Sequence, residues 1–222
     1  MNRHDSLTDL AWLLLAALLF SAVGLIGVVT PLSPGAVSFG RSLIASTALG
    51  LLVLSQPRAA WTPGLRWKTL IAGVGQAGNW SLFFAAIQTA GMDAAVLALF
   101  VYPVMTALIE PKLEGTKLRW VELAGAGLVL LGVFTVTPEL KLSNNVFVGI
   151  LLGLLSAAFL TVRNLVGKQI VPEVGAVRLN LWMCLACIPI FLPFRLLEGQ
   201  GVSWHEVGMI GSLALFFTVA PQ

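Results

Sequence analysis

Eight apolar runs, most of them about as long as a lipid bilayer is thick, follow one another along the chain. A helix needs about 20 mostly apolar residues to cross the roughly 30 Å of hydrocarbon in a bilayer. The runs cover residues 10–29, 35–54, 69–90, 94–109, 118–136, 146–166, 177–197 and 207–220. Only 10% of the residues are charged, whereas a soluble domain usually carries about 25%. The sequence therefore predicts an all-α, polytopic membrane protein.

Two other interpretations of these runs fit the sequence less well. Helices that are apolar on every side would leave a soluble protein without a polar surface. The first run also differs from a secretory signal peptide, because Asp5 and Asp9 precede it and no small-x-small cleavage site ends it. We therefore expect the first run to be a membrane helix of the mature chain.

Basic residues are unevenly shared between the two sets of connections that alternate along the chain. If the N-terminus is cytoplasmic, the outer connections hold only Lys141 and Arg195. The basic residues on the cytoplasmic side are then Arg3, Arg58, Arg66, Lys68, Lys112, Lys117, Arg119, Lys168 and Arg178. Cytoplasmic connections of membrane proteins are enriched in Lys and Arg. We therefore predict a multi-pass protein with a cytoplasmic N-terminus.

Part of the chain repeats itself at low identity. Residues 13–37 align with residues 153–177 at an offset of 140, which places Gly27 on Gly167. Five predicted helices separate the copies, and this odd number means that the second copy enters the membrane from the opposite side. Inverted repeats of this kind are typical of secondary transporters, whose substrate site lies near the bilayer midplane.

Three stretches carry a family signal, namely residues 32–54, residues 79–133 and residues 153–177. They resemble the EamA-type ten-helix exporters of the drug/metabolite transporter superfamily. Within the second stretch, Pro103 matches the proline of the family's fourth helix, and Glu114 matches the glutamate of its inner elbow. The resemblance implies export or exchange of small metabolites, often amino acids, across the bacterial inner membrane.

The repeat and the resemblance together divide the chain into two units. We expect residues 1–138 to form a complete five-helix bundle, and residues 139–222 to form the first three helices of an inverted second bundle, with helices 9 and 10 missing. The two bundles would rock about a midplane site, so that a bound substrate shifts the balance between inward and outward states. A half-transporter that works only as an assembly stays open as an alternative.

Arg41 is the first candidate for substrate binding, because it lies seven residues into the second predicted helix. That position is about 10 Å from the helix end at 1.5 Å per residue. An arginine in hydrocarbon is costly unless it reaches water, a counter-charge or backbone carbonyls. It would meet an anionic group such as a substrate carboxylate, or else snorkel outward or clamp neighbouring helix ends. We expect Arg163, near the cytoplasmic end of the sixth helix, to snorkel to the surface.

Further candidates for a cavity lie on the third and fourth predicted helices. Gln76, Asn79 and Phe83 share one helical face. The amide of Asn79 falls near the midplane, where it would bind substrate or bridge two helices. Tyr102 precedes Pro103, and a proline within a helix frees a carbonyl and permits a kink beside a cavity. Kinks of this kind also occur in purely structural helices.

Carboxylates are missing from the middle of every predicted helix. Proton-coupled carriers typically depend on such a group, so the sequence favours facilitated diffusion or exchange. Glu110 and Glu114 cluster at the inner elbow, where we expect them to pair with Lys112 and Lys117.

Other function classes find little support in the sequence. A membrane-embedded enzyme acting on a lipid-linked substrate is the alternative, but His4 and His205 lie on opposite sides in the predicted topology. Cys184 and Cys187 sit in an apolar run and are expected to pack rather than to bind metal. Nucleic-acid binding would need a basic patch with interleaved aromatics. We thus predict no catalytic residue, cofactor or metal, and the GxxxG motif at 149–153 indicates close helix packing, internal or in a homodimer.

Overall fold

The computed structural model describes residues 33–56, 62–115, 120–136, 144–198, 204–215 and 218, and within these ranges all regular structure is helical. The helices are α2 (Pro34–Leu54), α3 (Pro63–Ala90), α4 (Met92–Leu99), α5 (Tyr102–Glu114), α6 (Trp120–Val136), α7 (Asn144–Val174), α8 (Ala176–Glu198) and α9 (Trp204–Ala214). Five stretches in the described part of the chain are long and apolar enough to cross a membrane. The prediction of an all-α, polytopic membrane protein is therefore confirmed.

Most helix positions follow the apolar runs, and local capping explains where two of the helices begin. The hydroxyl oxygens of Ser33 and Thr62 accept hydrogen bonds from backbone N–H groups in the first turns of α2 and α3. A proline follows each cap, at a position where its missing N–H leaves no intrahelical bond unmade. α3 thus begins at Pro63 rather than at the predicted residue 69. The predicted helix at 10–29 lies outside the described residues.

The predicted fourth helix is divided into two. α4 ends at Leu99 and α5 begins at Tyr102, so the break directly precedes Pro103. Proline has no N–H to donate, and its ring clashes with the carbonyl four residues earlier. The carbonyl of Tyr102 accepts side-chain hydrogen bonds from Thr106 and from Thr161 of α7. The expected kink is therefore present, and one hydrogen bond to the carbonyl at the break comes from another helix.

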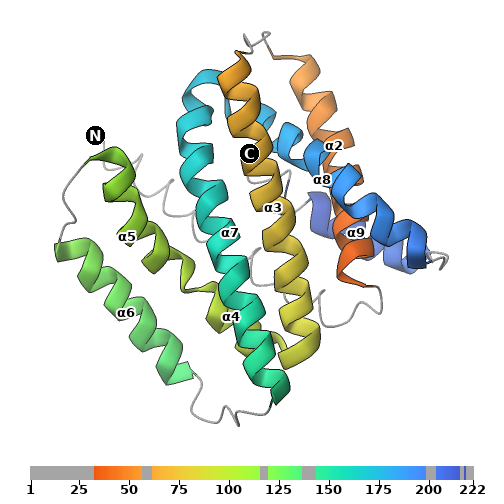
Figure 1. The fold of residues 1–222 in the computed structure, drawn as a ribbon. Helices are drawn as coiled ribbons and strands as arrows, with labels where there is room; N and C mark the ends of the chain where they lie inside the picture. The colour runs from red at the N-terminus through yellow and green to blue at the C-terminus, as the bar shows by residue number, and fades with distance from the viewer. Residues whose placement is uncertain are drawn as a thin grey trace, which may run out of the picture.

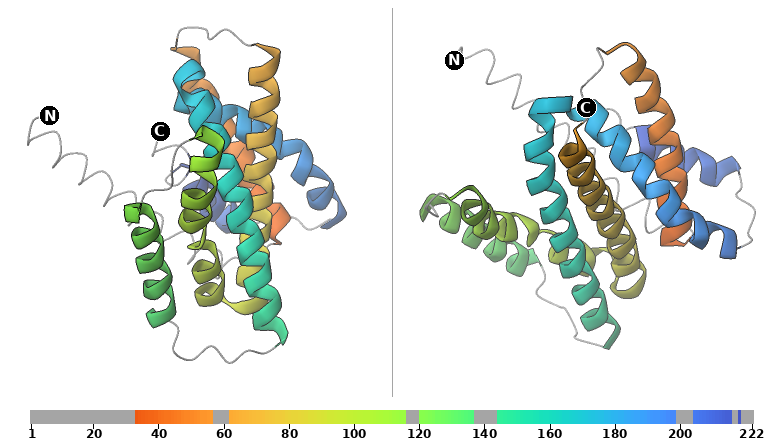
Figure 2. Two further views of the ribbon diagram at one scale, coloured as in Figure 1. Left: turned by 60° about the vertical axis from the view of Figure 1, so that its left-hand side comes forward. Right: turned by 45° about the horizontal axis from the view of Figure 1, so that its top comes forward.

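α3 and α7 lie side by side at the centre of the bundle (Figure 1). α2, α8 and α9 pack together on one side of this pair, whereas α5 and α6 lie on the other (Figures 1 and 2). Small residues make the central contact possible. Between α3 and α7, a Cβ added to Gly75 would lie 3.1 Å from the backbone oxygen of Phe159. Between α7 and α4, a Cβ added to Gly153 would lie 2.5 Å from the Cβ of Ala98.

The GxxxG motif therefore serves packing within the chain. Gly149 faces Ala90, and a Cβ at this glycine would overlap that alanine. Since both glycines of the motif are covered by neighbouring helices, the motif is no longer an argument for a homodimer.

One end of the bundle gathers charged residues from both predicted units. Leu65 packs with Ile170 and Val174, so the start of α3 lies beside the end of α7. Lys168 contacts Glu114 at the end of α5. We call the end that carries Arg66, Glu114 and Lys168 the charged end.

Candidate functional site

Asn79 joins the two central helices. Its side chain is buried, and its Nδ2 donates hydrogen bonds to the hydroxyl oxygen of Ser156 (2.9 Å) and to the backbone oxygen of the same residue (3.3 Å). The Ser156 hydroxyl donates in turn to the backbone oxygen of Asn79 (2.9 Å). Polar side chains that bond across helices in this way hold membrane helices together. This arrangement favours the helix-bridging alternative for Asn79.

Arg41 is buried within the bundle, with only 5% of its surface exposed. Its guanidinium carbon lies 4.1 Å from the centre of the Trp80 ring, and its Nε donates a hydrogen bond to the Thr218 hydroxyl (2.9 Å). A cation over an aromatic face is attracted by the electron-rich face of the ring. Within the described part of the chain, no carboxylate forms an ion pair with Arg41. The arginine therefore turns inward, and its positive charge lacks an anionic partner among these residues.

A second arginine extends this positive region. Arg163 of α7 is partly buried and lies close enough to Arg41 for the like charges to repel each other. Its Nη1 donates a long hydrogen bond to Asn164 (3.4 Å). Arg163 is thus held partly inside the bundle, and its expected snorkelling to the surface stays a prediction. At Arg163, α7 packs closely against α3, because the Arg163 Cβ would lie only 3.0 Å from a Cβ built on Gly75.

Three buried oxygens on the helices around Arg41 have no hydrogen-bond partner among the described residues. They belong to the side chains of Ser38, Gln76 and Asn180. Asn180 also donates through Nδ2 to the backbone oxygen of Thr218 (2.9 Å), which connects it to the partner of Arg41. A buried polar group without a partner costs about 1–3 kcal/mol. Such groups are therefore expected where a ligand completes the bonding.

Phe83 takes part in the apolar core rather than in this polar region. It is buried among residues of α2, α3, α4, α7 and α9. Cys184 and Cys187 are likewise fully buried, in a second apolar cluster that includes Trp80. Their positions agree with the packing role expected for both cysteines. In the part of the chain that the structure describes, no group of three or more His, Cys, Asp or Glu side chains is arranged to hold a metal ion.

A cavity of about 430 Å³ lies between α5 and α7. Its lining comprises Tyr102, Pro103, Thr106, Ala107, Glu110, Pro111, Glu114, Asn164 and Lys168. Tyr102 and Pro103 thus line a cavity, whereas the expectation that they bind substrate stays a prediction. Arg41, Gln76 and Asn79 do not line it.

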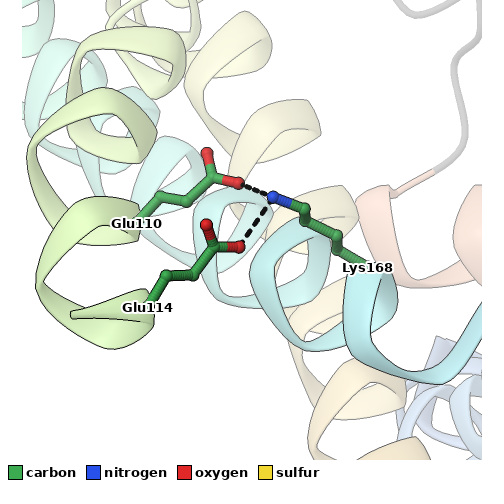
Figure 3. Close-up of polar contacts among 3 residues, drawn as sticks. All are labelled: Glu110, Glu114 and Lys168. Carbon is green, nitrogen blue, oxygen red and sulfur yellow. Dashed lines mark hydrogen bonds and ion pairs between the residues drawn. The ribbon is translucent and has the colours of Figure 1, made fainter. Parts of the chain in front are cut away.

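An ion-paired cluster stands where this cavity reaches the charged end (Figure 3). The Nζ of Lys168 contacts Glu110 and lies 2.7 Å from Oε1 of Glu114. Glu110 and Glu114 are one turn apart on α5, so both carboxylates face α7. Among the described residues, both carboxylates pair with Lys168 of another helix and not with Lys112, as had been expected. Lys112 is exposed, and Lys117 lies outside the described residues.

Comparison with known proteins identifies the family. The sequence pattern of the EamA-like transporter family matches residues 8–137, which is more than half of the chain. The chain belongs to the EamA-like transporter family. Members of this family are membrane transporters of the drug/metabolite transporter superfamily, and they are not enzymes. No curated protein sequence matches the chain.

A solved structure supports the fold of this EamA-like protein. A crystal structure described only as that of a protein superimposes with a TM-score of 0.69 at 21% sequence identity. The match covers 92% of this chain and 75% of the other. At this identity the likeness concerns the fold alone.

Proposed function

We propose that this EamA-like protein moves a small metabolite with a carboxylate or similar anionic group across the membrane by alternating access. The observation that carries the proposal is the buried Arg41, whose charge has no carboxylate partner in the described part of the chain. A charge removed from water is costly unless it is paired. An anionic substrate would supply the missing partner during each transport cycle.

The surroundings of Arg41 suit a substrate that also carries hydrogen-bond donors. The unpartnered amide oxygens of Gln76 and Asn180 are acceptors, and the hydroxyl of Ser38 can accept when its proton is turned elsewhere. Arg163 adds a second positive charge nearby. We infer that the anionic group lies between the arginines and that donor groups of the same substrate face these acceptors. A small amino acid or a related acid has this chemistry.

The cavity between α5 and α7 would serve as the route between this polar region and the charged end. Tyr102 and Asn164 line its inner part, and Asn164 accepts the hydrogen bond of Arg163. The opposite part is closed by the contacts of Lys168 with Glu110 and Glu114. Lys168 is more than half exposed, and exposed ion pairs contribute little to stability. They can therefore break and reform as the two units rock.

Uptake into sealed vesicles that contain the protein tests this function. The panel would include amino acids, dicarboxylic acids, sugars and a cationic drug. We expect uptake of a carboxylate-bearing substrate, and we expect Arg41→Gln to reduce it by at least about tenfold, since one charge-assisted contact is lost. Arg41→Lys should retain part of the activity because the charge remains.

Two controls separate a substrate role from a structural one. Thr218→Val removes the hydrogen bond to Arg41 but leaves the charge, so it should change uptake less than Arg41→Gln. Lys112→Gln alters an exposed charge and should leave uptake unchanged. Size-exclusion chromatography checks that each variant is folded. Full uptake of carboxylates by a folded Arg41→Gln protein would show that Arg41 only clamps helices.

A further inference from the structure

A groove of about 530 Å³ runs between α3 and α8, apart from the proposed substrate route. The residues that line it are Arg66, Thr69, Leu70, Trp182, Leu185 and Ala186. They form two matching sets, with spacings of i, i+3 and i+4 on each helix, so each set occupies one helical face. The groove therefore runs between two neighbouring helices.

Most of this groove is apolar and opens outward from the bundle. Leu70, Trp182 and Leu185 are 46%, 44% and 37% exposed, although all three belong to helices that are candidate membrane spans. The Thr69 hydroxyl bonds to the backbone oxygen of Leu65 and presents no free donor to the groove. Its deeper part ends where Ala186 meets Gly73. A hydrocarbon chain fits such a surface, because it buries apolar area and needs no polar partner.

The mouth of the groove is positively charged. Arg66 is the fourth residue of α3, at the charged end, whereas Leu70 lies one turn further along the helix, about 6 Å deeper by helix geometry. Lys68 and Trp67 are exposed beside it, and tryptophan is enriched at the level of lipid headgroups. Basic pockets between membrane helices bind anionic lipid headgroups.

We infer that this groove binds an anionic phospholipid of the leaflet at the charged end. The phosphate lies against the guanidinium of Arg66, which offers paired donors that match phosphate oxygens. One acyl chain follows the groove past Leu70 and Leu185. The inference needs only the groove and its charge, and it is independent of the transported substrate.

Lipid retention during purification tests the inference. The full chain would be exchanged into detergent with phosphatidylglycerol or phosphatidylethanolamine of identical acyl chains, and bound lipid counted by native mass spectrometry. We expect phosphatidylglycerol to be retained about fivefold better, the preference that one basic residue near an anionic headgroup supplies. Arg66→Gln should abolish this preference and should lower the retention of phosphatidylethanolamine less than that of phosphatidylglycerol, because the ammonium group of phosphatidylethanolamine offsets the charge of its phosphate.

Two further variants decide whether the groove itself is the site. Lys68→Gln removes an exposed positive charge two residues away, outside the groove lining, and should keep most of the preference. Leu70→Trp fills the groove from an exposed position and should lower retention of both lipids. If Arg66→Gln and Lys68→Gln reduced the preference for phosphatidylglycerol equally, the inference would be overturned in favour of diffuse surface charge. Undiminished retention in Leu70→Trp, or a second protein copy bound in place of lipid, would overturn it as well.

Discussion

The two sides of α7 contact their neighbours in opposite ways. Toward α3, glycines bring the backbones together and Asn79 exchanges hydrogen bonds with Ser156. Toward α5, a cavity separates much of the two helices. The Thr161 hydroxyl donates to the Tyr102 carbonyl at one end of this contact, and exposed ion pairs of Lys168 hold the other. A close-packed interface cannot change without strain, whereas a contact built on exposed ion pairs separates easily. We therefore expect α7 to move with α3 and to part from α5.

The strongest test of this difference enlarges a glycine between α3 and α7. Gly75→Leu introduces atoms where even a Cβ would lie 3.1–3.2 Å from backbone atoms of α7. Backbone cannot yield as a side chain can, and overpacking usually costs about 1–3 kcal/mol, with a larger loss where nothing moves. We expect a loss of at least about 3 kcal/mol in the free energy of unfolding, measured by denaturation in mixed detergent micelles.

Gly50→Leu is the matched control for this substitution. Gly50 also lies within a helix, but a Cβ there meets nothing within 4 Å. Its unfolding free energy should stay close to that of the parent protein. If both leucine variants were equally stable, the contact between α3 and α7 would be looser than the glycines indicate, and the proposed difference between the two sides would fail.

A second test addresses the polar part of the same interface. Asn79→Ala removes the two hydrogen bonds that the Asn79 side chain donates to Ser156, whereas the Ser156 hydroxyl still donates to the backbone oxygen of residue 79. Because bonds between membrane helices contribute about 0.6 kcal/mol on average and about 1.7 kcal/mol at most, we expect a loss of about 1–2 kcal/mol. A double-mutant cycle with Ser156→Ala should give a coupling energy of about 1 kcal/mol.

The outcome also separates the two roles that the sequence left open for Asn79. A helix-bridging role lowers stability in Asn79→Ala and couples it to Ser156. A substrate-binding role would instead change the concentration dependence of uptake while stability stayed unchanged. Zero coupling with altered uptake would therefore contradict the helix-bridging role of Asn79.

The sequence predicted the elements of this fold better than their contacts. Hydropathy located α2 and α8 almost to the residue, because a membrane span needs a long apolar run. It did not give the start of α3, where Arg66 and Lys68 interrupt the apolar pattern while the Thr62 cap extends the helix. Proline chemistry predicted a kink at Pro103, but it did not reveal that the carbonyl of Tyr102 accepts a hydrogen bond from Thr161, which lies far along the chain.

The candidate site was harder to predict, for a physical reason. Helical spacing shows which residues share a face, but it does not show which helix that face meets. Gln76 and Asn79 were grouped correctly on one side of α3, yet Ser156 was missed as the partner of Asn79. The same limit explains why Glu110 and Glu114 were paired with nearby lysines. A local partner is the only kind that sequence distance can suggest.

The smallest expected effect on stability comes from the contact between α5 and α7. Lys168→Met removes both ion pairs at the charged end, and because the lysine is exposed we expect little change in the unfolding free energy. The substitution should instead make the cavity between α5 and α7 more accessible to water-soluble reagents. A cysteine placed at Thr106, which lines the cavity, should react several-fold faster with a water-soluble thiol reagent when Lys168 is replaced. The native Cys184 and Cys187 are buried and give a low background.

Lys112→Met provides the control, since Lys112 is an exposed lysine at the same end that does not line the cavity. High salt should mimic Lys168→Met, because it screens exposed charges. Unchanged labelling of the Thr106 cysteine in Lys168→Met, at low and at high salt, would mean that the ion pairs do not restrain α5. Any separation of α5 from α7 would then have to depend on the break before Pro103 rather than on the ion pairs at the end of α5.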